Sequence, residues 1–196
     1  MAQAKGSRAD QLLETATLLF KEKGYHNTSM QDLADALGMQ KGSLYYYIDS
    51  KEELLRALLE QATSILGAQI DEIYAADLSP AEKLRRALEN HGQAMMDHLN
   101  LVTVYLQEYR SLPAVRLEEV MERREHYENR LMQILQDGIA SGEFRTVNIK
   151  LTVFGFLGML NWTHQWFSPD GELSSEEIAA ILADLAMQAV LVNPDE

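Results

Sequence analysis

Residues 28–47 read Thr-Ser-Met-Gln-Asp-Leu-Ala-Asp-Ala-Leu-Gly-Met-Gln-Lys-Gly-Ser-Leu-Tyr-Tyr-Tyr, and this stretch decides the fold. Thr28 and Gln31 have the spacing of a capping box, which predicts the start of a short helix that Gly38 ends. A second helix is expected over residues 40–47. The small side chain of Ala34 lets the two helices approach closely. Their shared core is expected to contain Leu33, Leu37 and Leu44. Two short helices that meet at a glycine predict a helix-turn-helix.

The second helix is too short and polar for a good core helix, and its first turn suits a DNA major groove. Gln40, Lys41, Gly42 and Ser43 offer a cation, two hydrogen-bonding side chains and one residue without a side chain. The hydroxyls of Tyr45, Tyr46 and Tyr47 can reach phosphates. Packing remains the alternative role of this tyrosine triplet, with at least one ring half-buried. The helix starts at Thr28–Ser29 and Ser50–Lys51 are also expected to hold phosphates.

A longer string surrounds these residues: Phe20-x-x-x-Gly24-Tyr25-x-x-Thr28-Ser29-Met30-x-x-Leu33-Ala34-x-x-x-Gly38-x-x-Lys41-Gly42-Ser43-Leu44-Tyr45-Tyr46-Tyr47-Ile48-x-x-Lys51-x-x-Leu54. It resembles the DNA-binding domain of the tetracycline-repressor (TetR) family over roughly residues 8–60. Ile48 departs from that pattern, in which phenylalanine is common. The resemblance implies a homodimeric repressor that binds a palindromic operator and is released by a small molecule.

By this resemblance, Lys41 and Gly42 approach bases. The residues implied to hold phosphates are Thr28, Ser29, Ser43, Tyr45, Tyr46, Tyr47 and Lys51. Repression, as opposed to activation, is implied by the family alone.

The rest of the chain also has helical periodicity, so the expected fold class is all-α with about nine helices. Three helices form an amino-terminal helix-turn-helix head over residues 1–50. A ligand-binding and dimerisation body follows over residues 51–196, and a long helix over about 51–75 connects the two. Further helices are expected after Pro80, around 101–109, after Pro113 to about 141, and over 149–167 and 175–191.

The 196-residue chain contains no cysteine, which excludes disulfides and thiol nucleophiles and is compatible with a cytoplasmic protein. The net charge of −13 argues against a protein that coats nucleic acid unselectively. Residues 1–60 contain seven Lys or Arg and nine Asp or Glu, a net charge of only −2. A DNA contact is therefore expected in the first third of the chain.

The segment 149–167 is apolar nearly all round, so it must bury more than one face. A symmetry-related subunit is the natural partner, and the last two helices are expected to form a four-helix dimer interface. Its residues are Gly155, Gly158, Trp162, Trp166, Ile181 and Leu185. The tail from Gly158 to Ile178 also looks like that of TetR-type regulators of fatty-acid catabolism, several of which respond to acyl-coenzyme A thioesters. Helix packing and dimer contact remain the favoured roles of this motif.

The body carries polar groups in phase with apolar ones, which indicates either buried ion pairs or a ligand site. Arg124 lies in an apolar stripe, where it meets either a structural glutamate or the anionic part of an inducer, with the structural pair favoured. The expected ligand-binding residues are Met95, Tyr105, Glu108, Tyr109, Arg124, Tyr127 and Phe154. A small hydrophobic inducer is predicted, with acyl-coenzyme A as the candidate and a neutral or cationic hydrophobic compound as the alternative.

No catalytic residue, metal site or cofactor is expected, because the sequence has no serine elbow, phosphate-binding glycine loop or paired-carboxylate signature. His91 shares a face with Leu84 and Leu88, which favours a hydrogen-bonded core histidine over a metal ligand. An enzyme would have to rely on residues such as Asp97, His98 and Glu108. A ligand-free interaction module is the third alternative, favoured if the body proves solidly packed.

Overall fold

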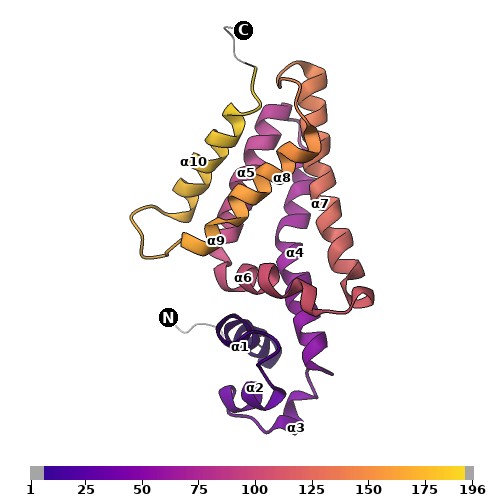
Figure 1. Cartoon of the computed structure of the whole chain (residues 1–196), viewed down its shortest axis with the longest axis vertical. Helices are drawn as coiled ribbons and strands as arrows, with labels where there is room; N and C mark the ends of the chain where they lie inside the picture. Colours follow the sequence, from indigo (N-terminus) through magenta and orange to yellow (C-terminus); the bar gives the residue numbers. More distant parts are fainter. Residues whose placement is uncertain (1–6, 193–196) are drawn as a thin grey trace. The chain divides into compact units, whose positions relative to one another are not determined.

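The computed structural model describes residues 7–192, and it confirms the predicted all-α fold (Figure 1). Among these residues the one β pairing is an isolated bridge between Phe144 and Leu191. None of the described helices is both long and apolar enough to cross a membrane. The helices are α1 Arg8–Lys23, α2 Met30–Ala36, α3 Lys41–Leu44, α4 Lys51–Ala75, α5 Pro80–Asp97, α6 Leu99–Glu108, the 3-10 helix η1 Tyr109–Ser111, α7 Ala114–Ser141, α8 Ile149–Asn161, α9 Thr163–Trp166 and α10 Ser175–Gln188.

Short polar signals set the helix boundaries. Ser79 and Glu82 form a capping box at the start of α5, and Ser174 and Glu177 form another at the start of α10. Glycine ends the early helices as expected, with φ of 81° at Gly24 and 61° at Gly38. Both angles lie in the region that glycine adopts at least cost.

Three helix predictions need correction. The capping box of α2 is Ser29 with Asp32 rather than Thr28 with Gln31, because the Thr28 side chain turns inward and donates to backbone carbonyls. Helix α3 has four residues instead of the predicted span 40–47. The expected helix over 149–167 is two helices, since α8 ends at Asn161 and α9 begins at Thr163.

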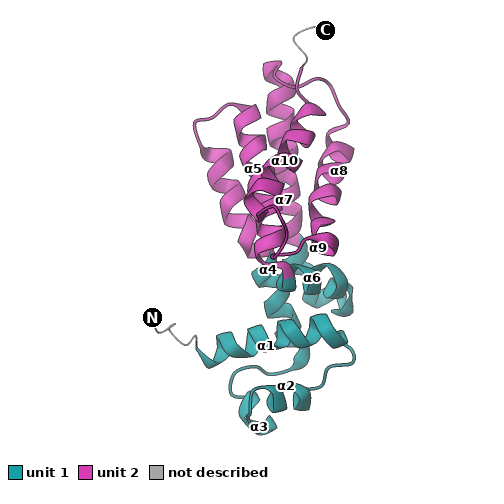
Figure 2. Ribbon diagram, turned by 90° about the vertical axis from the view of Figure 1, so that its left-hand side faces the viewer, with its two compact units in different colours: residues 1–62, 100–121 teal, residues 63–99, 122–196 magenta. Residues whose placement is uncertain are grey.

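The chain divides into two compact units (Figure 2). Unit 1 comprises the described part of residues 1–62 together with 100–121, and unit 2 comprises 63–99 together with the described part of 122–196. This structural division differs from the expected boundary at residue 50. Helices α4 and α7 each contribute residues to both units.

The core of unit 1 is built on α1 to α4. Phe20 of α1, Leu33 of α2 and Leu44 of α3 are completely buried. Phe20 makes an edge-to-face contact with Tyr25, with ring centroids 5.3 Å apart. The predicted packing of α2 on α3 is present, although Leu37 is only partly buried. This core holds the short α3 helix with its polar face outward.

The core of unit 2 gathers apolar residues from α4, α5, α7, α8 and α10. Its members include Ile70, Leu84, Leu88, Leu131, Ile134, Val153, Leu160 and Ala183. Helix α10 packs along α5, where a Cβ at Gly92 would lie 3.1 Å from the Cβ of Ala179. The inward faces of α8 and α10 are therefore committed to this core.

Candidate nucleic-acid interface, ligand pocket and dimer face

The predicted DNA-reading residues form an exposed segment of unit 1. Gln40, Lys41 and Gly42 at the start of α3 are all exposed. A Cβ placed on Gly42 would find no atom within 4 Å, so the backbone is open to close approach by another molecule. Tyr46 is 89% exposed, and Tyr45 and Tyr47 are 46% and 45% exposed. The expectation that one of these rings is half-buried fits Tyr45 and Tyr47, and Tyr46 projects almost wholly into solvent.

Two of the predicted phosphate-binding residues have other roles in this structure. Thr28 is buried, and its hydroxyl donates to the carbonyl oxygens of Leu19 and Gly24. The Lys51 ammonium donates to the carbonyl oxygens of Tyr25 and Thr28 at 2.8 and 2.7 Å. Burial lowers the pKa of Lys51, and the nearby Glu108 carboxylate opposes that shift. These two side chains position the turn before α2. Ser29 remains exposed at the start of that helix.

The predicted ligand-binding residues are divided between the two units. Tyr105, Glu108 and Tyr109 belong to unit 1, whereas Met95, Arg124, Tyr127 and Phe154 belong to unit 2. Tyr105 and Tyr109 stack on each other with ring centroids 6.2 Å apart. Met95 is buried on α5. The helical periodicity predicted that these side chains face inward. Periodicity alone does not show which inward face borders a cavity.

Three members of this set have the following contacts and positions in this structure. Glu108 accepts hydrogen bonds from the backbone N–H of Tyr25 and the hydroxyl of Ser111, so its carboxylate is engaged within unit 1. Phe154 is 40% exposed, on the outer side of α8. Arg124 donates through Nε to Glu128 at 2.7 Å, which supports the structural ion pair that the sequence favoured. Its partner is one turn along the same helix.

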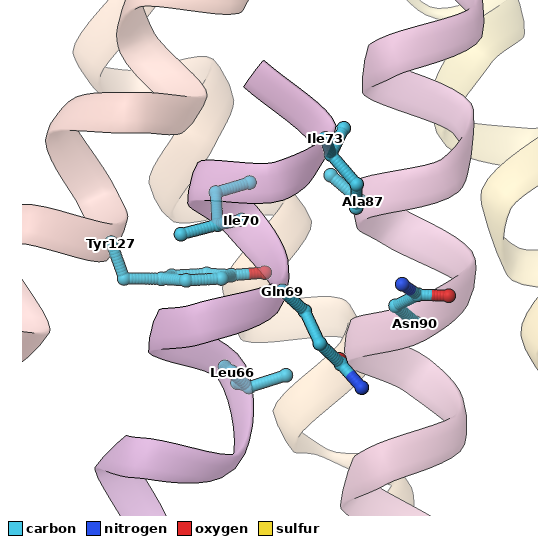
Figure 3. A pocket seen from close by; sticks show the side chains of 7 residues that line it. All are labelled: Leu66, Gln69, Ile70, Ile73, Ala87, Asn90 and Tyr127. Carbon is cyan, nitrogen blue, oxygen red and sulfur yellow. The ribbon is translucent and has the colours of Figure 1, made fainter. Parts of the chain in front are cut away.

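The structure has a pocket between α4, α5 and α7 within unit 2 (Figure 3). The non-atom space within it is about 140 Å³, part of it open to solvent, and its walls leave no room for a water molecule. The lining residues are Leu66, Gln69, Ile70 and Ile73 of α4, Ala87 and Asn90 of α5, and Tyr127 of α7. The walls are mainly apolar, with two neutral amides and one hydroxyl. Of the predicted ligand-binding residues, only Tyr127 lines it. Gln69 and Asn90 were missed, because polar residues beside an apolar stripe also occur on ordinary solvated faces.

A buried hydrogen-bonded chain continues from this pocket. The Tyr127 hydroxyl lies 3.0 Å from Nδ1 of His91, and Nε2 of His91 lies 2.9 Å from Oδ1 of Asn161. Burial lowers the pKa of His91 to about 4 and raises that of Tyr127. His91 is therefore neutral at pH 7, and it donates from Nε2 while Nδ1 accepts from the tyrosine. The predicted core histidine is confirmed as buried and hydrogen-bonded.

An exposed apolar surface covers the outer sides of α8 and α10. On α8 and its carboxyl-terminal cap it comprises Leu151, Phe154, Gly155, Gly158 and Trp162; on α10 it comprises Ile181 and Leu185. We call this surface the α8–α10 face. Trp162 is 62% exposed, and Ile181 and Leu185 are each 56% exposed. Trp166 of the short α9 is also exposed. Large exposed apolar side chains gathered on two neighbouring helices are typical of an interaction site.

Two family profiles match the chain. The profile described as "Bacterial regulatory proteins, tetR family" matches residues 12–58. The profile described as "Tetracyclin repressor-like, C-terminal domain" matches residues 77–190. Together they cover both the helix-turn-helix and most of the helices that follow it.

The chain is similar to repressors and other transcriptional regulators, and the similarity extends over most of the length of each. The HTH-type transcriptional repressor KstR2 of Mycolicibacterium smegmatis is 30% identical over 175 residues, which are 88% of this chain and 85% of that protein. The structure of the regulator PfmR from Thermus thermophilus is 37% identical with a TM-score of 0.84, over 91% of this chain and 98% of that one. The structure of AibR in complex with isovaleryl coenzyme A and operator DNA is 30% identical with a TM-score of 0.82, over 91% and 97% of the two chains.

Proposed function

Because the chain belongs to the tetR family of bacterial regulatory proteins and is a DNA-binding transcriptional repressor, we propose that α3 reads its operator and that an acyl-coenzyme A thioester relieves repression. The DNA-binding part of this proposal rests on the first residues of α3. There the Lys41 side chain and the Gly42 backbone are both exposed, and no atom lies within 4 Å of a Cβ at Gly42. Gln40 and Ser43 add hydrogen-bonding groups, and Ser29 with the three tyrosines supplies contacts to phosphates. We place this repressor in the cytoplasm, where a bacterial operator lies.

We expect Lys41→Ala to weaken specific operator binding by about 1–3 kcal/mol without unfolding the protein, because the side chain is exposed. Gly42→Val is expected to weaken binding more. Its side chain has space in the free protein but occupies the gap into which a base edge must come. Gel-shift titration at fixed salt, with an operator selected from random duplex DNA, measures both effects.

Gly67→Val is the matched control, since a Cβ at this α4 glycine also has nothing within 4 Å. It is expected to bind the selected operator like the wild type. If Lys41→Ala and Gly42→Val also bind it like the wild type, α3 is not the recognition element.

We propose that the dimer forms through the α8–α10 face. The inward sides of both helices are committed to the core of unit 2, so the outward apolar side chains need another partner. A twofold axis brings the same face of a second subunit against them, as isologous interfaces require. Such a dimer presents two α3 helices to successive major-groove turns, about 34 Å apart, and reads a palindrome. In functional terms we retain a DNA-binding head over residues 1–50 and a ligand-binding and dimerisation body over 51–196.

The proposed inducer class rests on the pocket and on AibR. AibR is 30% identical along nearly the whole chain, and its structure contains isovaleryl coenzyme A. The pocket is mainly apolar, so its lining suits a short hydrocarbon group, but the walls have to move apart to admit one. Ligand pockets usually measure about 300–1,000 Å³, so the body has to open further to bind a whole thioester. Arg124 is already paired with Glu128, and we do not assign it to the inducer.

Isovaleryl coenzyme A is expected to raise the melting temperature of the wild-type protein and to release the selected operator. Free isovalerate and coenzyme A alone are expected to do so far less. Gln69→Trp should abolish this response while leaving operator binding intact, because position 69 lines the pocket and is itself exposed. Thermal-shift and gel-shift titrations with each compound measure both effects.

Ala68→Trp is the control, because position 68 also lies on α4 but does not line the pocket. A neutral hydrophobic compound is the second candidate, since Gln69, Asn90 and Tyr127 bring no charge to the pocket. A response to such a compound but to no acyl thioester overturns the proposed inducer class.

A further inference from the structure

Glu108, the last residue of α6, uses both oxygens of its carboxylate within unit 1. Oε1 accepts from the backbone N–H of Tyr25 at 3.0 Å, and Oε2 accepts from the hydroxyl of Ser111 at 2.7 Å. Tyr25 lies in the turn that joins α1 to α2, and Ser111 ends η1. Hydrogen bonds to a charged acceptor are roughly twice as strong as those between neutral groups. Glu108 therefore ties the turn before the helix-turn-helix to the end of α6.

A second charged side chain holds the other side of the same residue. The Lys51 ammonium donates to the carbonyl oxygens of Tyr25 and Thr28, and it lies 4.3 Å from the centroid of the Tyr25 ring. The N–H of Tyr25 is thus bound by a carboxylate from α6, and its C=O by an ammonium from α4. With both groups fixed, the direction in which the chain enters α2 is set.

These contacts join residues from the two parts of the chain that match different family profiles. Tyr25 and Lys51 lie in the segment that matches the amino-terminal family profile, residues 12–58. Glu108 and Ser111 lie in the segment that matches the carboxyl-terminal profile, residues 77–190. Both segments meet within unit 1. The Glu108–Tyr25 hydrogen bond joins the DNA-binding part of the chain directly to the part that follows it.

We propose that Glu108 is a positioning residue for operator recognition, which sets the orientation of α2 and α3 through the Tyr25 backbone. It does not itself touch DNA. This proposal rests on the proposed reading of the operator by α3. The two proposals can be tested separately, because the Lys41 and Gly42 variants test α3 in a protein with Glu108 unchanged. A change in the position of α6 reaches the operator-reading helices through this bond.

A graded set of variants tests this role. Glu108→Ala removes both hydrogen bonds, Glu108→Gln removes the charge but keeps one amide oxygen as an acceptor, and Ser111→Ala releases only one anchor of the carboxylate. Glu118→Ala removes an exposed carboxylate elsewhere in unit 1 and serves as the control. The measurements are affinity for the selected operator, affinity for a scrambled duplex, melting temperature, and amide hydrogen exchange at Tyr25.

We expect Glu108→Ala to weaken operator binding at least 10-fold with affinity for the scrambled duplex unchanged, and to speed exchange of the Tyr25 amide. Glu108→Gln and Ser111→Ala are each expected to lose about threefold in operator affinity, and Glu118→Ala is expected to lose none. If Glu108→Ala does not fold, an operator-specific loss in Ser111→Ala supports the role, and wild-type operator binding by that variant overturns it. The proposal is also overturned if Glu108→Ala binds the operator like the wild type, or if both affinities fall together with the melting temperature, which is the sign of a merely structural role.

Discussion

Gly158→Arg is expected to convert the dimer into a folded monomer and to reduce operator binding by more than 100-fold. In the single chain the new side chain has space, since a Cβ at Gly158 finds nothing within 4 Å. In the proposed dimer it lies in the middle of the α8–α10 face, where a guanidinium is desolvated without a partner. Operator affinity falls as well, because one subunit reaches only one half-site and loses the second set of contacts.

Sedimentation velocity at micromolar concentration measures the assembly state, and circular dichroism checks that the helices remain. Gln136→Arg adds the same charge to an exposed position of α7, outside the α8–α10 face, and is expected to stay dimeric. A Gly158→Arg protein that sediments as a dimer and binds the operator normally would show that the subunits meet elsewhere.

The structure of residues 24–47 was largely predictable from sequence because its signals are local. Gly24 and Gly38 end helices through their own backbone conformation, and the exposure of Lys41 and Gly42 follows from the short span between Gly38 and Leu44. The capping box was predicted one residue too early, because local signals alone do not decide this position. Thr28 and Ser29 are both good caps, and only the packing of Thr28 against the end of α1 decides between them.

The pocket between α4, α5 and α7 was not predictable, because it depends on side chains from three helices. Helical phase correctly placed Tyr127 and His91 inside the body, yet it gave Phe154 the same apolar signal although that ring faces outward. The outward and the inward faces of α8 are both apolar in sequence. Only the packing of α8 on α5 decides which of them is buried. The hydrogen bond of Glu108 was likewise not predictable, since its partner Tyr25 is 83 residues away in the chain.

The buried His91 predicts a second large effect, a steep acid-side loss of stability. Its pKa is about 4 in the folded protein, against an ordinary value of 6.5, because burial disfavours the imidazolium. Above pH 6.5 the histidine is neutral in both states, and its contribution to folding is complete. Between pH 6.5 and pH 4 the His91 imidazole is protonated in the unfolded chain but stays neutral in the folded protein. The free energy of unfolding therefore falls by up to about 3 kcal/mol across this window.

His91→Gln should remove this dependence while keeping both hydrogen bonds, since the amide oxygen can accept from Tyr127 and the amide nitrogen can donate to Asn161. Urea unfolding between pH 7 and pH 5 measures the slope, and it avoids the more acid range in which carboxylates titrate. Asp32, whose pKa is lowered to about 2 by hydrogen bonds from Ser29, loses its contribution only below about pH 4. His98→Gln, at an exposed position, is expected to keep the wild-type slope. Equal slopes for the wild type and His91→Gln would mean that His91 accepts a proton in the folded protein, and the neutral Tyr127–His91–Asn161 chain would then be wrong.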